Sequence, residues 1–239
     1  MLKDLLAVNT RDKSALPKAK ELGYGLEVEE YMFALTEALI TEKQKAVPHL
    51  MDGFSKFSFH GVVIGYDDIN RHSEAELLSK YNVTYSQARF HNIDKIVYHA
   101  NYVAGHETES AWIDRQTAFW RRFLRDIQAS ARVYLENFVD DTPGLMARLC
   151  DTIGDPRFKI CFDAGHARCN SKTDVVDWIR QLGRRVEHVH LHNNDGLTDR
   201  HWPLGRGVLN DREVIENVLE YTNAEMIVLE CDYEESLLG

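Results

Sequence analysis

Three histidines at alternate positions, His188, His190 and His192, are closely followed by Asp199 and His201. Alternate side chains of a strand share one face, so the three imidazoles should project together, with the second pair on the loop that follows. Imidazole and carboxylate are ligands that zinc and manganese prefer. The pattern predicts a divalent-metal site. Three surface histidines on an edge strand would explain the triplet but not the acid and imidazole after it.

Residues of the same types recur where other apolar segments end. In chain order the set is His60, His99, Glu136, Asp163, His190 and Glu230, with His166 three positions after the aspartate. Burying one such group without a partner costs roughly 2–7 kcal/mol, and a shared cation would satisfy several of them together. The sequence therefore predicts that these side chains gather around metal ions.

Each of these residues also has an ordinary structural interpretation. His60 and His99 could be hydrogen-bonded strand-end histidines, Glu136 or Glu230 could pair with an arginine, and Asp163 could be only a helix N-cap. We give these interpretations less weight because six successive strand ends rarely carry ligand-type residues by chance. For the remaining histidines we expect one to fill the interior and four to be solvated: His188, and then His49, His72, His91 and His106.

Eight short apolar, β-branched segments alternate with stretches of helical periodicity. The predicted strands are Leu6–Asn9, Gly25–Glu29, Phe57–Val62, Lys95–Asn101, Arg132–Phe138, Lys159–Asp163, Val186–His192 and Glu225–Glu230. The predicted helices include Ser14–Leu22, Ser73–Arg89, Glu109–Ser130, Pro143–Ile153, Thr173–Arg184 and Asp211–Tyr221. This alternation implies an α/β protein with a parallel sheet, and eight units imply a closed (β/α)8 TIM barrel. An open, doubly wound sheet is the alternative.

The C-terminal residues 234–239 could only begin an eighth helix. We therefore expect that helix to be reduced or absent, with the last strand covered by a neighbouring subunit or by missing residues. A homodimer is the corresponding expectation, and a strictly monomeric mass in solution would count against it.

Composition indicates an ordinary globular protein of 239 residues, 44% of them hydrophobic, and we expect one domain over residues 1–239. Lys plus Arg number 28 against 38 Asp plus Glu, a net charge of −10 that argues against a broad nucleic-acid surface. The N-terminal segment turns polar too soon for a signal peptide, and no apolar run is long enough to span a membrane. We expect a cytoplasmic protein whose four cysteines, which lack Cys-x-x-Cys spacing, are reduced.

Five segments carry a family resemblance: Leu135-Glu136-Asn137, Phe162-Asp163-Ala164-Gly165-His166, His190-Leu191-His192-Asn193, Asp199-Arg200-His201-Trp202-Pro203-Leu204-Gly205-Arg206-Gly207 and Leu229-Glu230. In them the chain resembles the xylose isomerase-like TIM-barrel superfamily, which contains sugar and sugar-phosphate isomerases and epimerases and also endonuclease IV. The epimerase pattern implies one divalent ion held by Glu136, Asp163, His190 and Glu230, with His166 contacting the substrate. The endonuclease IV pattern implies three zinc ions that also use His60, His99, His166, Asp199 and His201.

The resemblance favours a sugar or sugar-phosphate isomerase or epimerase that depends on Zn²⁺, Mn²⁺, Co²⁺ or Mg²⁺. The ion would stabilise an enediolate while Glu136 and Glu230 act both as ligands and as acid and base. Further substrate contacts are predicted at His192, Arg206, Tyr102 and Trp202. Short connections after the strands and the negative charge also favour a small substrate.

The alternative is an endonuclease IV-like multinuclear zinc hydrolase acting on abasic-site DNA or a small phosphodiester. A single-ion isomerase does not need all nine ligand positions to be filled, whereas a hydrolase of this kind would use them. A barrel that only binds a sugar or a partner is a third hypothesis, which the complete ligand set disfavours.

Overall fold

The computed structural model describes residues 2–64, 72–100, 102–103 and 105–231. Eight parallel strands form a closed barrel in which each strand pairs with its neighbour in the chain and β8 returns to β1. The strands are β1 (Leu6–Asn9), β2 (Gly25–Val28), β3 (Phe57–His60), β4 (Lys95–His99), β5 (Arg132–Glu136), β6 (Phe158–Asp163), β7 (Val186–Leu191) and β8 (Met226–Leu229). The predicted TIM barrel is therefore confirmed, and the open sheet is excluded.

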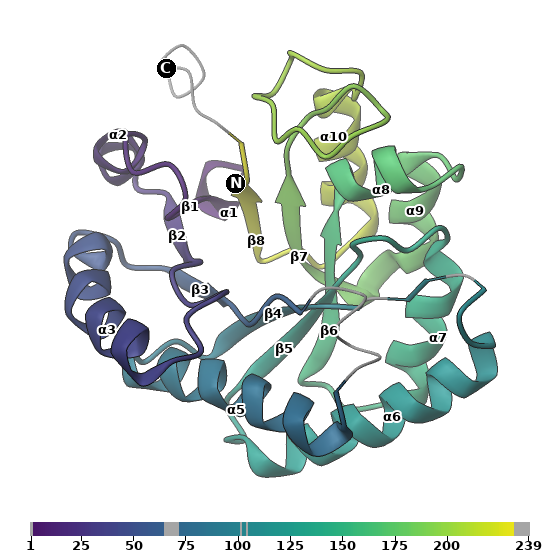
Figure 1. Cartoon of the computed structure of the whole chain (residues 1–239). Helices are drawn as coiled ribbons and strands as arrows, with labels where there is room; N and C mark the ends of the chain where they lie inside the picture. Colours follow the sequence, from purple (N-terminus) through teal and green to yellow (C-terminus); the bar gives the residue numbers. More distant parts are fainter. Residues whose placement is uncertain (1, 65–71, 101, 104, 232–239) are drawn as a thin grey trace.

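Helices surround the barrel (Figure 1). They are α1 (Leu2–Leu5), α2 (Leu16–Leu22), α3 (Glu37–Met51), α5 (Glu74–Phe90), α6 (Glu109–Asp126), α7 (Pro143–Ile153), α8 (Ala164–Asn170), α9 (Val175–Leu182) and α10 (Asp211–Tyr221), with a short 3-10 turn at Gly183–Arg185. Local chemistry fixes several ends: Ser73 and Glu76 form a capping box at the start of α5, and Gly154 ends α7 at a φ of 66°.

Three helices were not predicted from the sequence: α1, α3 and α8. In α3, Val47 is the one buried residue, so the apolar periodicity that reveals a surface helix is nearly absent. Helix α8 starts directly after Asp163, whose side chain accepts a hydrogen bond from the backbone of His166. The interpretation of Asp163 as an N-cap is therefore correct, and the cap places His166 beside the strand end.

The main apolar core lies between the strands and the helices, where Trp112, Trp120 and Phe123 of α6 are fully buried or nearly so. Tyr81 of α5 stacks on Tyr98 of β4 with ring centroids 4.6 Å apart. Inside the barrel the packing is different, because apolar residues fill one end and polar side chains occupy the middle and the carboxyl end of the strands. This polar interior positions the site.

Residues 232–239, on which the prediction of a reduced eighth helix depends, lie outside the described residues. Within the described ranges no helix is long and apolar enough to cross a lipid bilayer.

Candidate metal centre

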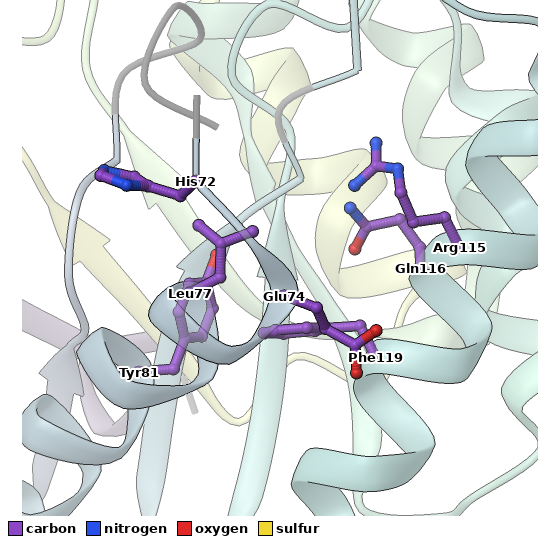
Figure 2. A pocket seen from close by; sticks show the side chains of 7 residues that line it. All are labelled: His72, Glu74, Leu77, Tyr81, Arg115, Gln116 and Phe119. Carbon is purple, nitrogen blue, oxygen red and sulfur yellow. The ribbon is translucent and has the colours of Figure 1, made fainter. Parts of the chain in front are cut away.

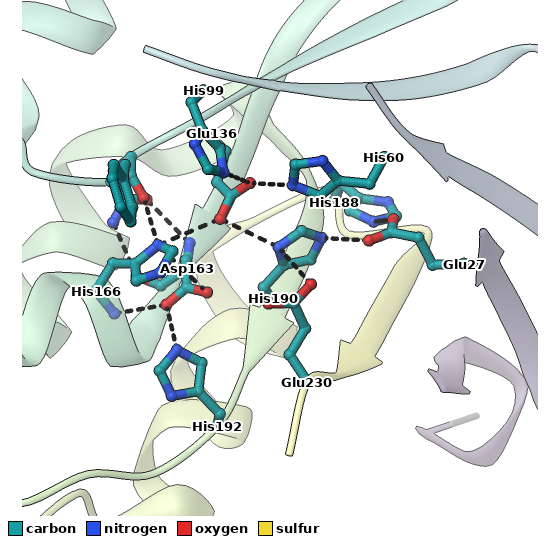
Figure 3. Close-up of polar contacts among 12 residues, drawn as sticks. Glu27, His60, His99, Glu136, Asp163, His166, His188, His190, His192 and Glu230 are labelled. Atoms are coloured by element: carbon teal, nitrogen blue, oxygen red, sulfur yellow. Dashed lines mark hydrogen bonds and ion pairs between the residues drawn. The ribbon is translucent and has the colours of Figure 1, made fainter. Parts of the chain in front are cut away.

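Glu136 stands at the middle of a cluster of histidines at the carboxyl ends of the strands (Figure 3). Its Oε2 lies 3.1 Å from Nε2 of His60 and 3.3 Å from Nε2 of His99. Its Oε1 lies 3.2 Å from Nδ1 of His166 and 3.3 Å from Nδ1 of His190. One carboxylate, only 1% exposed, thus separates two pairs of imidazoles, one pair for each oxygen.

Asp199, on the loop after β7, lies at the centre of a second group of imidazoles. Its carboxylate lies 3.4 Å from Nε2 of His166, 3.4 Å from Nε2 of His192 and 3.2 Å from Nε2 of His201. Asp163 closes the group from the other side, 3.3 Å from Nε2 of His192. His201 has a left-handed backbone, with φ of 49°, and its Nδ1 contacts the carbonyl oxygen of Glu230, so that Nε2 is held toward Asp199.

His190 and Glu230 complete the centre. Oε1 of Glu230 lies 3.3 Å from Nδ1 of His190, the same nitrogen that faces Glu136. On the opposite side of the ring, Nε2 lies 2.9 Å from Oε1 of Glu27. The four residues predicted to hold one ion and the five predicted to extend a multinuclear site therefore lie together at one end of the barrel.

The donor atoms fit divalent cations. Among the residues that the structure describes, five groups have ligand atoms within 4.8 Å of one another: His60–His99–Glu136, Glu136–Asp163–His166, His166–His192–Asp199–His201, Glu27–His190–Glu230 and Cys161–His188–His190. Within the described part of the chain, Oδ2 of Asp163, Oε1 of Glu230 and Nε2 of His192 are buried without a hydrogen-bond partner. Buried carboxylate and imidazole atoms are costly to leave unsatisfied, and a metal ion would satisfy them.

Charge pairing shifts the pKa values of these groups. Burial alone would lower the pKa of His60, but the carboxylate of Glu136 outweighs it and raises that pKa to about 9. Burial likewise acts to raise the pKa of Glu136, and His190 and His99 outweigh it, holding the pKa well below its usual value. A metal ion bound at His60 would therefore have to displace a proton from its imidazole.

The predicted substrate contacts lie in different surroundings. His192 is fully buried within the centre, and Tyr102, 8% exposed, packs edge-on against Trp112. Trp202 exchanges backbone hydrogen bonds with Asn193 of 2.8 and 2.9 Å, and the guanidinium of Arg206 lies 5.3 Å from the Trp202 ring. Trp202 and Arg206 thus belong to the loop that carries Asp199 and His201.

The expectation that His91 is solvated was wrong. It is 8% exposed, and its Nε2 lies 2.7 Å from the hydroxyl of Tyr31. The residue lies three positions after Ala88 and seven after Thr84, both of which are buried in α5, so continuing the helical period of α5 would have predicted its burial. His49 and His106 are exposed and His72 is partly buried, while His188 is fully buried inside the barrel as expected.

Sequence reasoning missed Glu27, Glu29 and Arg11. Glu27 is fully buried on β2, and Glu29 follows the same strand, 8% exposed. Arg11 donates from Nε to Oε2 of Glu29 over 3.4 Å. Burial, and then the nearby Glu230, raise the pKa of Glu29 to about 8. The rule applied to the other strands, a ligand-type residue that ends an apolar segment, would also have found Glu29.

A separate pocket of about 250 Å³ lies between α5 and α6 (Figure 2). It is lined by His72, Glu74, Leu77, Tyr81, Arg115, Gln116 and Phe119, none of which belongs to the metal centre. This pocket is therefore separate from the metal centre.

Comparison with known proteins agrees with this geometry. The family model described as "Xylose isomerase-like TIM barrel" matches residues 81–237. A curated relative, "Probable endonuclease 4" of Mycobacterium tuberculosis, is 29% identical over 140 residues, which cover 54% of this chain and 55% of the relative. The chain thus spans about half the length of that relative.

Two solved structures share the fold. The TTHB071 protein from Thermus thermophilus, in a structure described as soaked with ZnCl2, has a TM-score of 0.71 and 26% identity over 96% of this chain and 92% of its own. A D-tagatose 3-epimerase-like protein has a TM-score of 0.71 and 19% identity over 93% of this chain and 88% of its own. With the closed barrel and the family match over most of the length, the chain belongs to the xylose isomerase-like TIM-barrel family.

Proposed function

We propose that this protein is a multinuclear, divalent-metal-dependent hydrolase of phosphoester bonds. The placement of Glu136 carries the proposal, because each of its oxygens faces a different pair of imidazoles. In that position Glu136 would be shared by two of the groups that could hold an ion, His60–His99–Glu136 and Glu136–Asp163–His166, which suits a multinuclear centre. The sequence alone favoured an isomerase; this contact geometry favours the alternative.

The chain's own residues would hold three ions in adjacent groups. His60 and His99 face one side of Glu136, and Asp163, His190 and Glu230 face the other; the third group is His166, His192, Asp199 and His201. Zinc is the ion that this set of imidazoles and carboxylates suits best, with manganese and cobalt as substitutes. When bound, such ions supply Lewis acidity toward a phosphoryl group and neutralise the charge that develops on it.

Other contacts fix the ligands in place. The carbonyl of Glu230 anchors His201, and the N-cap bond of Asp163 to the backbone of His166 fixes the strand end against α8. The hydrogen bonds of Asn193 to Trp202 and to the carbonyl of Leu209 hold the loop that carries Asp199. These contacts pre-set the ligand positions before a substrate arrives.

Charge favours a small phosphoester over duplex DNA as the substrate. The chain carries 28 Lys plus Arg against 38 Asp plus Glu, whereas a DNA-binding surface needs clustered basic residues to replace counterions. The relative named "Probable endonuclease 4" supports hydrolysis as the reaction class, and the half-length match leaves the substrate of this chain to experiment.

A sugar isomerase or epimerase is the second candidate. One observation favours it: Glu136 and Glu230 approach the same nitrogen of His190 from two sides, each at 3.3 Å. Two carboxylates this close together could act as acid and base on a substrate bound beside them. The two candidates differ in the number of ions and in what Glu136 does.

Metal analysis together with Glu136→Gln separates them. Protein purified without chelator should contain about three zinc ions per chain if it is the hydrolase, and about one if it is the isomerase. In the hydrolase, Glu136→Gln should lower the zinc content and reduce cleavage of bis(p-nitrophenyl) phosphate by more than the roughly 100-fold typical of changes around a metal site. If the protein is an isomerase, Glu136→Gln should leave one ion bound and abolish turnover of every ketose in a test panel.

Glu187→Gln is the matched control. Glu187 is also a buried strand carboxylate, 8% exposed, and it pairs with Arg132 at 2.6 Å on the outside of the barrel, so its substitution should leave metal content unchanged. Full zinc content in Glu136→Gln, with phosphoester cleavage retained, would contradict the proposal.

A further inference from the structure

Glu27 lies beneath the metal centre on β2, and it is not one of the nine predicted ligands (Figure 3). It is fully buried, and its carboxylate contacts three polar side chains. Its Oε2 accepts a hydrogen bond from the hydroxyl of Ser58 over 2.8 Å and lies 2.9 Å from Nε2 of His188. Its Oε1 lies 2.9 Å from Nε2 of His190. Burying a carboxylate is costly, so we expect Glu27 to have a role beyond packing.

The two nitrogens of His190 face different partners. Nδ1 lies 3.3 Å from both Glu136 and Glu230, whereas Nε2 faces Glu27. A neutral imidazole carries one N–H and one lone pair, and only the nitrogen with the lone pair can bind a metal. Both nitrogens face carboxylates, but Nδ1 faces the two predicted ligands Glu136 and Glu230, so Nδ1 is the nitrogen that would give up its hydrogen to an ion. The carboxylate of Glu27 would then accept the hydrogen that remains on Nε2.

We propose that Glu27 is a positioning residue of the metal centre. Its carboxylate keeps the hydrogen of His190 on Nε2 and so directs the lone pair of Nδ1 toward an ion shared with Glu136 and Glu230. Nε2 and Oε1 are close but not aligned as a hydrogen bond, and coordination at Nδ1 would fix the ring rotation that aligns them. This inference rests on the proposed metal centre.

Glu27 forms a group with His190 and Glu230 whose ligand atoms lie within 4.8 Å of one another, but only one of its two oxygens is available to that group. Its Oε2 is already engaged by Ser58 and His188, which also fix the rotation of the carboxylate. His188 is in turn stacked on the ring of Tyr134, with centroids 5.1 Å apart and planes 18° from parallel. Glu27 is thus held from below by the barrel interior and presents only Oε1 to the centre.

The test compares the zinc affinity of Glu27→Gln with that of the wild type and of Glu187→Gln, by competition with a chelating dye. Loss of a group that orients a ligand typically weakens metal binding about 10–100-fold, which is the expected effect of Glu27→Gln. Glu187→Gln removes another buried strand carboxylate, one that faces Arg132 outside the barrel, and should bind zinc like the wild type. Ser58→Ala, which removes one hydrogen bond to Glu27, should show a smaller loss and serves if Glu27→Gln does not fold.

A second readout is independent of affinity. In zinc-loaded protein labelled with ¹⁵N-histidine, the His190 signal should report hydrogen on Nε2, and Glu27→Gln should alter it; His190→Asn identifies the signal. Wild-type affinity with an unchanged His190 signal would make Glu27 a structural filler and overturn the inference. A loss of one ion even at saturating zinc would make it a ligand and also overturn it. If the wild type itself binds no zinc, the proposed function fails instead.

Discussion

Gly165, on the first turn of α8, shows how closely the centre is packed. A Cβ at this position would overlap the imidazole ring of His192, which lies against the helix. His192 shares the group that includes Asp199 and His201, so displacing its ring should disturb that group first. The added methyl group alone would displace the His192 ring.

We therefore expect Gly165→Ala to lower the zinc content of the protein by about one ion per chain, the ion of the His192 group. Elemental analysis after dialysis measures it. Gly144→Ala is the matched control, since Gly144 is also in the first turn of a helix and a Cβ there meets no atom within 4 Å. Equal zinc content in both variants would show that His192 is not a ligand.

Asp140 provides a pH-dependent contribution to stability away from the ligands. Burial raises its pKa to about 7, although the backbone N–H of Phe138 donates to Oδ2 over 3.0 Å. An acid whose pKa is raised on folding favours the folded state at low pH. That contribution is complete below the unfolded pKa near 4 and is lost as the pH rises toward 7.

Asp140→Asn removes this titration. The free energy of unfolding of the wild type, minus that of the variant, should fall by about 1.4 kcal/mol per pH unit between pH 5 and 7. Urea denaturation of metal-free protein at several pH values measures it. In Asp151→Asn the same difference should stay flat over this range, because a hydrogen bond from Arg185 lowers the pKa of Asp151. A flat difference for Asp140→Asn would contradict the assignment.

Among the secondary-structure elements, those that recur at regular spacing are predictable from the sequence, and those without a periodic pattern are not. All eight strands and the closed barrel follow from regularly spaced apolar segments, and the ligand residues follow from the rule that polar chemistry gathers at the carboxyl ends of barrel strands. Observed strands mostly end one or two residues earlier than predicted, as β5 does at Glu136, since the ligand loops continue the extended chain.

The elements and residues that the sequence did not predict were missed for physical reasons. Helix α3 packs through too few buried residues to show a period, and α8 is specified by the cap of Asp163 more than by its composition. Glu27 was missed because a lone acid inside a strand gives no local sign of its partners. Ser58 meets it because β3 pairs with β2 and the two residues are register partners, and His188 meets it from β7 across the barrel interior.

For the whole molecule, the centre joins strands that are far apart in the chain. His60 on β3, Glu136 on β5 and His190 on β7 meet within one cluster, together with the loop that carries Asp199. Ions bound there would link these strands in the folded state and would have no such site in the unfolded chain. Binding should therefore add to the stability of the whole barrel.

Removal of metal should accordingly lower the melting temperature, and added zinc should restore it. Free zinc at 100 times the dissociation constant should raise the free energy of unfolding by about 2.7 kcal/mol for one ion, and by more if several bind independently. Thermal unfolding of chelated protein across a zinc titration measures this, with Asp199→Asn expected to give a smaller rise because its group loses the carboxylate that contacts three imidazoles. A melting temperature that does not change with zinc concentration would mean that these residues only pair with one another.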